Sequence, residues 1–211
     1  MPIFRDLYLV DGIPAMTPPG FHQYLVHLGL CWQHQGLALE VGCWLGATSR
    51  SLLSGLKQAG YNLPFHAYDR WTASPEEVSK AAARGLHLEL HQDLCKPYLD
   101  NVTKVYGDVV AHRQEIGDDF EPGELGSPIE ICLLDAPKKD PVFSRVMDVV
   151  VARSIPGVTI FGLLDYRLHE LRPNHLEYLA PLKYIEKHAT HFSRLATQPM
   201  GSTAAFFRYE G

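Results

Sequence analysis

The stretch LEVGCWLGATS, residues 39–49, decides the fold class. It has the form of a buried strand end, a turn with Gly42 and Gly46, and the first turn of a helix. Strand–glycine turn–helix units are typical of α/β folds and often bind a nucleotide or a related ligand at the helix start. An acid, Glu40, stands where a phosphate-binding loop would carry glycine. The expected ligand must therefore tolerate a carboxylate at the mouth of the turn.

Apolar periodicity on both sides of this stretch predicts strands that alternate with helices. Strands are predicted at 37–41, 63–69, 112–116, 129–135 and 157–165, and helices at 18–36, 48–60, 74–85, 92–106, 141–154 and 174–187. Alternation of this kind predicts parallel βαβ units. The closing segment 191–211 has two strand-like runs around a Met-Gly-Ser turn, which predicts an antiparallel hairpin.

Length and composition predict one globular domain over residues 1–211, with 1–20 as an N-terminal extension that could serve as a lid or an oligomer contact. The net charge of -5 and scattered basic residues argue against a nucleic-acid partner. No apolar run has transmembrane length and no signal peptide is evident, so we expect a cytoplasmic protein without a membrane partner. A small-molecule partner is expected, and a homo-oligomer is left open.

The cysteines and histidines do not form metal-binding motifs in the sequence. Cys31, Cys43, Cys95 and Cys132 stand far apart without a CxxC pair, so they are expected to be reduced, buried thiols. The pairs His87–His91 and His188–His191 have no acidic or cysteine partner at zinc-site spacing. A histidine metal site is therefore disfavoured.

Carboxylates follow the predicted strands at the edge where an open α/β sheet binds its ligand. Asp69, Asp135 and Asp165 each end a predicted strand, and Glu40 lies next to them. Such an edge would repel a pyrophosphate but attract a cationic ligand without phosphate. S-adenosylmethionine meets this requirement with its sulfonium and ammonium groups. Asp69 could then accept hydrogen bonds from the ribose hydroxyls.

Four segments, EVGCWLGATS, HAYDRW, ICLLDAP and PGVTIFGLLDY, together resemble the class I S-adenosylmethionine-dependent methyltransferases. The resemblance spans about residues 20–166 and is closest to the macrocin O-methyltransferase-like enzymes, which methylate sugar hydroxyls of natural products. It implies a Rossmann-like, seven-stranded, mostly parallel sheet with helices on both faces and a C-terminal antiparallel hairpin. It also implies O-methylation of a small-molecule hydroxyl. The implied cofactor-binding residues are Glu40, Gly42, Gly46, Thr48, Asp69 and Asp118.

Three of the neighbouring residues have two open readings. Tyr68 and Trp71 could stack on an adenine ring or belong to the core. Asp118 could reach the adenine amino group or be a solvated loop acid.

The reacting end is expected at Asp135 and Lys138, whose spacing resembles the metal-dependent catechol and caffeoyl-type O-methyltransferases. There the aspartate binds magnesium and the lysine is the base, so Asp135 and Asp165 are the candidate metal ligands. The sequence departs from that pattern because Leu164-Asp165-Tyr166 stands where Asp-Asp or Asp-Asn is expected. His169 could be a replacement base or ligand, or a surface histidine. Lys138 could also be a solvated loop residue or hold a phosphorylated acceptor.

Other functions are weighed against this one. N-methylation of a base would need Asn or Asp, two prolines and an aromatic residue, and DAPK lacks the aromatic. A Rossmann-type oxidoreductase conflicts with Glu40. A non-catalytic cofactor-binding domain stays open, because a fold alone does not establish chemistry.

Overall fold

The computed structural model describes residues 8–82, 86–197 and 199–211. The strands are β1 (Tyr8–Val10), β2 (Ile13–Ala15), β3 (Leu37–Val41), β4 (Phe65–Asp69), β5 (Val109–Arg113), β6 (Ile129–Leu134), β7 (Ile160–Leu163), β8 (Phe192–Thr197) and β9 (Ala205–Tyr209). The α-helices are α1 (Pro19–Leu30), α2 (Ala47–Gln58), α3 (Pro75–Ala82), α4 (Cys95–Val102), α5 (Val142–Val151), α6 (Leu168–Leu171) and α7 (Ala180–Lys187). Short 3-10 helices lie at η1 (Leu176–Leu179), η2 (Ala189–His191) and η3 (Pro199–Gly201).

Seven strands form one sheet in the order β5-β4-β3-β6-β7-β9-β8. The pairs β4–β5, β3–β4, β3–β6 and β6–β7 are parallel, whereas β9 pairs antiparallel with both β7 and β8. This confirms the predicted Rossmann-like sheet with its terminal hairpin. The parallel strands end at one edge, and the chain reverses its direction of winding between β3 and β6. In open α/β sheets, this switch point is the usual position of the ligand.

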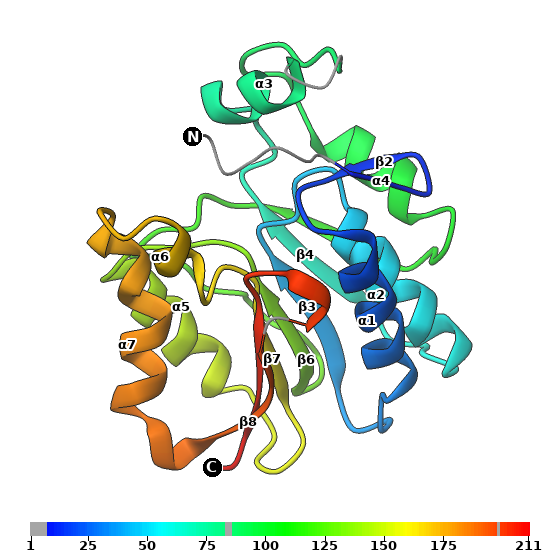
Figure 1. Cartoon of the computed structure of the whole chain (residues 1–211). Coiled ribbons are helices and arrows are strands. Elements are labelled where there is room, and N and C mark those ends of the chain that lie inside the picture. The colour runs from blue at the N-terminus through cyan, green and yellow to red at the C-terminus, as the bar shows by residue number, and fades with distance from the viewer. Residues whose placement is uncertain (1–7, 83–85, 198) are drawn as a thin grey trace.

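Helices cover both faces of the sheet (Figure 1). The strand β3 is buried on both faces, as its unbroken apolar run predicts. Leu37, Leu39 and Val41 pack with residues of α5 and α7, while Ala38 faces the layer formed by α1, α2 and α4. By the two-residue period of a strand, Glu40 points to the same face as Ala38, toward α2.

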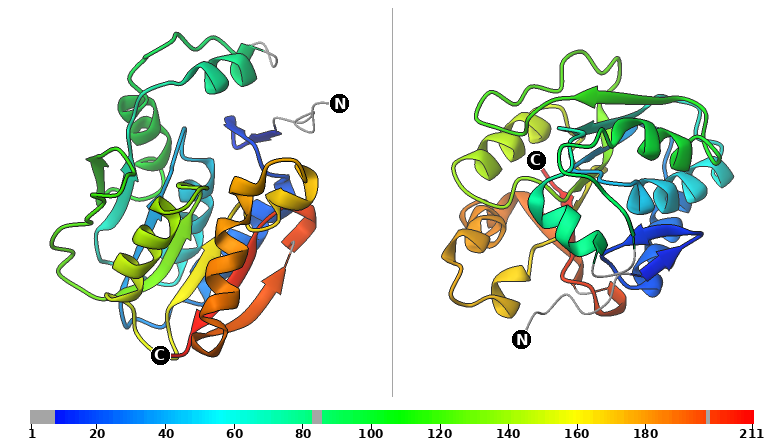
Figure 2. Two further views of the ribbon diagram at one scale, coloured as in Figure 1. Left: turned by 90° about the vertical axis from the view of Figure 1, so that its left-hand side faces the viewer. Right: turned by 90° about the horizontal axis from the view of Figure 1, so that it is seen from above.

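Two segments lie above the carboxyl edge of the sheet: α3 and the hairpin of β1 with β2 (Figures 1 and 2). The helix α3 begins with the predicted capping box, in which the Glu77 amide donates to Ser74 Oγ at 3.2 Å and Ser74 donates back to the Glu77 carboxylate. The hairpin was not predicted from the sequence. Its strands have three residues each, too few for a two-residue hydrophobic period to be recognised.

Several predicted elements differ in their bounds. The strand predicted at 112–116 is β5 at Val109–Arg113, because Val109 and Ala111 pack against the α1/α2/α4 layer. The helix predicted at 174–187 is divided into η1 and α7, with Pro181 in the first turn of α7, where its missing N–H costs nothing.

The prediction of four buried cysteines was partly wrong. Cys43 and Cys132 are buried, Cys95 is half-buried, and Cys31 is exposed because it follows the last turn of α1 at the surface. Among residues 8–82, 86–197 and 199–211, no helix combines the length and apolar character needed to cross a membrane.

Candidate active site

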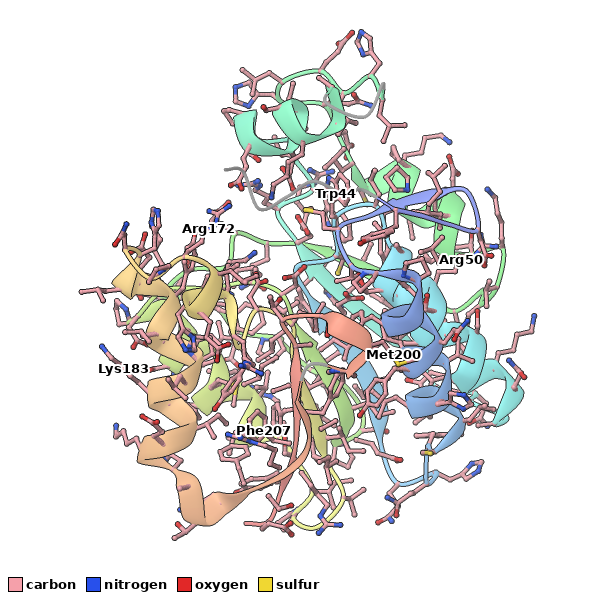
Figure 3. The ribbon with its side chains drawn as sticks, in the orientation of Figure 1. Trp44, Arg50, Arg172, Lys183, Met200 and Phe207 are labelled. Carbon is pink, nitrogen blue, oxygen red and sulfur yellow. The ribbon has the colours of Figure 1, made fainter. Side chains whose placement is uncertain are left out.

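A cavity of about 700 Å³ opens at the carboxyl edge of the parallel strands. Its wall comes from the glycine turn, the ends of β4, β6 and β7, the segment before α1, and α3 and α6. Trp44, Arg172 and Met200, labelled in Figure 3, belong to three distant parts of the chain and all line it. Among the described lining residues, carboxylates outnumber cationic side chains six to four. The volume suits a small ligand, and the charge favours a cationic one.

The glycine turn is shaped by two glycines in the left-handed conformation. Gly42 has φ +86°, and a Cβ there would lie 2.8 Å from the backbone nitrogen of Ala136 after β6. Gly46 has φ +85°, and a Cβ there would lie 2.8 Å from Val102 Cγ1. Both positions therefore require glycine, for conformation and for close approach. Gly42 lines the cavity, whereas Gly46 is the N-cap residue of α2.

Glu40 lies beneath this turn rather than at its mouth. Its side chain is 0% exposed and is not among the residues that line the cavity. The hydroxyls of Thr48 and Ser49 in the first turn of α2 donate to its two oxygens. Burial raises the pKa of Glu40 to about 8, although these hydrogen bonds lower it. In this arrangement Glu40 and Thr48 fix α2 to β3, and neither is among the residues that line the cavity.

Asp69 ends β4 and does line the cavity. Its Oδ2 accepts the backbone N–H groups of Cys43 at 2.8 Å and Trp44 at 3.1 Å, and its Oδ1 accepts that of Trp71 at 3.0 Å. A carboxylate has about four acceptor positions. Asp69 therefore holds the glycine turn in place and keeps about one position, on Oδ1, for a ligand.

The two aromatic residues left open by the sequence belong to the core. Trp71 is 0% and Tyr68 1% exposed, and neither lines the cavity. Trp71 packs on Tyr98 at 4.6 Å between ring centroids and donates its Nε1–H to the His112 carbonyl.

Trp44 is the aromatic residue that reaches the cavity, and sequence reasoning missed it. Its Nε1 is buried and has no hydrogen-bond partner within the described residues. It lies between the two glycines of the turn in a left-handed conformation, with φ 46°. A buried, unpaired N–H on a cavity wall is a donor for a ligand acceptor. The sequence gives no signal for this, because a tryptophan inside a glycine turn usually packs in the core.

Two of the predicted site residues lie outside the cavity. Asp118 is exposed and does not line it, and the loop after β5 contributes Glu115 and Ile116 instead. The strand ends earlier than predicted, which shifts the residues facing the ligand toward the N-terminus. His169 lies on α6 but its neighbours Leu168 and Leu171 line the wall in its place. At this position the helix directs its leucines inward.

The segment before α1 adds Thr17 to the cavity wall, a residue with no motif in the sequence. Its hydroxyl lies 2.8 Å from Nε2 of His22, whose Nδ1 lies 2.9 Å from Ser51 Oγ on α2. His22 is 3% exposed, and burial lowers its pKa to about 4. A neutral imidazole thus fixes the Thr17 hydroxyl over the glycine turn.

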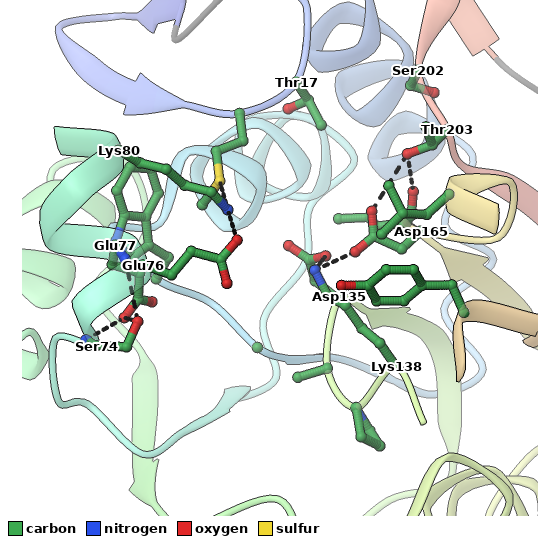
Figure 4. Close-up of a pocket in the computed structure, with 18 of the residues that line it drawn as sticks. Thr17, Ser74, Glu76, Glu77, Lys80, Asp135, Lys138, Asp165, Ser202 and Thr203 are labelled. Atoms are coloured by element: carbon green, nitrogen blue, oxygen red, sulfur yellow. Dashed lines mark hydrogen bonds and ion pairs between the residues drawn. The ribbon is translucent and has the colours of Figure 1, made fainter. Parts of the chain in front are cut away.

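Asp135, Lys138 and Asp165 come together after β6 and β7 (Figure 4), and Asp135 adjoins the glycine turn because Gly42 packs against Ala136. Lys138 Nζ lies 3.8 Å from Asp135 Oδ1 and forms a closer ion pair with Asp165 Oδ2. Burial raises the pKa of Asp135 to about 7, against the lowering effect of Lys138, and Asp165 adds to the rise. Burial lowers the pKa of Lys138, but the two carboxylates outweigh it and hold the pKa above its usual value. At neutral pH, Asp135 can therefore exchange a proton while Lys138 keeps its charge.

The residues of this group do not fit a magnesium ion in the arrangement observed. Magnesium prefers octahedral oxygen coordination, and Asp135 and Asp165 are two carboxylates with an ammonium group between them. Leu164 packs in the α1/α2/α4 layer, and the Tyr166 hydroxyl accepts a hydrogen bond from Arg194. Within the described parts of the chain, no three His, Cys, Asp or Glu side chains are grouped so that they could hold a metal.

Comparisons with known proteins identify the fold. No family model matches the sequence, and neither does any curated protein. Solved structures do match along nearly the whole chain. A cofactor-bound structure of Rv0187 from MTB has a TM-score of 0.61 and 14% identity, and covers 92% of this chain and 82% of its own. The chain has the class I methyltransferase fold.

Two further structures with the methyltransferase fold carry informative descriptions. CmcI-D160 in its Mg-SAM form has a TM-score of 0.57 and 14% identity, and covers 97% of this chain and 77% of its own. CalS11, a TDP-rhamnose 3'-O-methyltransferase of calicheamicin biosynthesis, has a TM-score of 0.56 and 13% identity, and covers 90% of this chain and 78% of its own. At these identities the likeness establishes the fold, and the activity must be argued from the site.

Proposed function

We propose that the protein is an S-adenosylmethionine-dependent methyltransferase that methylates a hydroxyl oxygen of a small molecule. The observation that carries this proposal is one continuous cavity at the carboxyl edge of the sheet. Its wall holds the glycine turn and Asp69 together with the adjoining group of Asp135, Lys138 and Asp165. A cofactor and an acceptor can thus lie in contact within one cavity, which is what a direct group transfer requires.

The chemistry of the wall matches the cofactor. Bound S-adenosylmethionine would supply an electrophilic methyl group on its sulfonium. The remaining acceptor position on Asp69 suits a ribose hydroxyl, and the excess of carboxylates suits a cation. The unpaired Nε1–H of Trp44 suits an acceptor atom on the ligand. A pyrophosphate, by contrast, would face Asp69 and Asp135 together.

The residues near the reacting end have distinct tasks. Asp135 accepts the proton of the acceptor hydroxyl while the oxygen forms its bond to the methyl carbon, and the bond from carbon to sulfur breaks with its electron pair left on sulfur. Lys138 stays protonated and orients the two carboxylates. A hydroxyl is a weak acid, so a base positioned in this way contributes about 10²- to 10⁴-fold to the rate.

The test is a transfer assay with methyl-labelled S-adenosylmethionine over panels of sugars, catechols and small hydroxy acids. We expect label to enter at least one hydroxyl compound, with the product one methylene heavier by mass spectrometry. Cofactor binding without transfer to any panel member would favour a non-catalytic cofactor-binding domain. Binding of NAD without binding of the methyl donor would favour an oxidoreductase and reject the proposal.

A further inference from the structure

We propose that the ammonium group of Lys138 is the resident cation of the reacting end and takes the place of a divalent metal between Asp135 and Asp165. The catalytic consequence, a metal-independent methyl transfer, rests on the proposed function. The exclusion of a divalent metal by Lys138 does not rest on the proposed function, because it depends only on the charges of this chain.

The first argument is the position of the ammonium group. Lys138 leaves the loop after β6 and reaches across to the residue that follows β7, so that its Nζ contacts both carboxylates (Figure 4). These side chains are only partly exposed, at 37% for Asp135, 20% for Asp165 and 39% for Lys138. The next residue, Lys139, is 64% exposed and pairs instead with Glu177 at 3.8 Å. The inward orientation is therefore specific to Lys138.

The second argument is that the residues beside Asp165 add no further charge to the site, so that Lys138 is what distinguishes it from a pair of carboxylates open to a metal. On either side of Asp165, the chain carries Leu164 in one core layer and Tyr166 in the other. The Tyr166 ring packs 5.1 Å from the Phe207 ring, and Thr203 donates to the Leu164 carbonyl at 3.0 Å. Leu164 also lines the cavity, and neither side chain carries a carboxylate that could join Asp135 and Asp165.

The third argument is electrostatic. A divalent ion between the two carboxylates would occupy the space of the ammonium group and repel it at a few ångströms, in a site where screening by water is reduced. To admit the ion, Lys138 would have to give up both of its ion pairs. The tethered ammonium therefore excludes a free divalent ion.

Replacement of Lys138 by an uncharged residue should create a metal site. In a Lys138→Gln variant, Asp135 and Asp165 would lose their shared counter-ion and repel each other. Mn²⁺ is the probe, because the electron paramagnetic resonance signal of the free ion falls on binding. We expect no saturable binding to the wild-type protein, and an affinity at least about tenfold higher in Lys138→Gln, which corresponds to about 1.4 kcal/mol.

Three variants serve as controls. Lys139→Gln removes the neighbouring charge and should behave like the wild type. The double variant Lys138→Gln/Asp165→Asn should lose the gained affinity. Lys138→Arg keeps the charge and should still exclude Mn²⁺, and saturable Mn²⁺ binding by Lys138→Arg would contradict the role of the charge.

Two results would overturn the inference: saturable Mn²⁺ binding by the wild type that Asp165→Asn abolishes, or a folded Lys138→Gln variant with no gain in affinity. Failure of the proposed function is scored separately, by the absence of S-adenosylmethionine binding, and leaves the Mn²⁺ result interpretable.

Discussion

Two neighbouring groups of acidic residues at the carboxyl edge of the sheet use their oxygens in opposite ways. At the glycine turn, Glu40 accepts hydrogen bonds from two hydroxyls of α2, and Asp69 accepts hydrogen bonds from three backbone N–H groups. After β6 and β7, Asp135 and Asp165 share Lys138, Asp165 also accepts a 3.5 Å hydrogen bond from Thr203, and both stay partly exposed. A carboxylate beside the end of a strand therefore does not by its position alone contact the bound ligand. A carboxylate whose oxygens are bonded to the protein stabilises the site, whereas one with free oxygens can contact the ligand.

Asp135→Asn should have the largest effect on activity. The amide cannot accept the hydroxyl proton, so we expect the turnover of the acceptor found in the panel to fall about 100-fold or more. The affinity for S-adenosylhomocysteine should change by less than about twofold, because the lost interaction belongs to the transition state. Turnover and binding calorimetry would be measured together.

Asp140→Asn is the matched control for this variant. Asp140 lies in the same loop but is exposed, does not line the cavity and accepts a hydrogen bond from Ser144 at 2.7 Å. It should turn over normally. An Asp135→Asn enzyme with normal turnover would remove Asp135 from the chemistry and with it the contrast between the two groups of acidic residues.

Gly42→Ala should damage the glycine turn. The new Cβ would combine an unfavourable left-handed conformation with a 2.8 Å approach to the Ala136 nitrogen. We expect a loss of about 2–3 kcal/mol in the free energy of unfolding and weaker binding of S-adenosylhomocysteine. Gly60→Ala has a similar φ of +85° with open space around it, and should cost about 1 kcal/mol without changing affinity. Equal effects of the two variants in urea unfolding would contradict the account.

Glu40→Gln should change how stability depends on pH. The pKa of Glu40 is raised in the folded protein from its usual 4.5 to about 8. The folded state therefore binds more protons than the unfolded state between these pH values, and wild-type stability should fall as pH rises through them. The variant should remove this fall, which amounts to about 1.4 kcal/mol for each pH unit between these two pKa values. Glu89→Gln removes an exposed carboxylate and should leave the pH profile unchanged.

The smallest expected effect is on cofactor affinity, and it should distinguish Trp44 from Trp71. Trp44→Phe removes an N–H that has no partner in the described structure, so stability should hold while cofactor affinity falls by about three- to tenfold. Trp71→Phe removes an N–H bonded to the His112 carbonyl, so stability should fall while affinity holds. The reverse pattern in melting temperature and calorimetry would show that the ligand does not reach Trp44.

The sequence predicts most of the fold and part of the site. The buried run at 37–41 and the capping box at Ser74 are local signals, and the structure confirms both. The sequence also predicts that Asp69, Asp135 and Asp165 share one edge, because parallel strands end together. It cannot predict that Glu40 faces α2 with both oxygens engaged, since this depends on the pairing of a strand with a helix in three dimensions.

Two residues predicted to belong to the site, Asp118 and His169, do not line the cavity, and the reason is the same for both. Asp118 and His169 follow elements whose ends were predicted a few residues away from their observed positions. A shift of that size decides which side chain faces the cavity. Thr17 and Trp44 have no motif, and only the tertiary structure brings them to the wall.

The most direct test of the central claim is a calorimetric titration of the protein with S-adenosylhomocysteine, with NAD titrated in parallel. We expect saturable binding of one S-adenosylhomocysteine per chain and no binding of NAD. The affinity for S-adenosylhomocysteine should be lower in Gly42→Ala and unchanged in Asp135→Asn. Saturable binding of NAD without binding of S-adenosylhomocysteine would contradict the claim that this cavity holds a methyl donor.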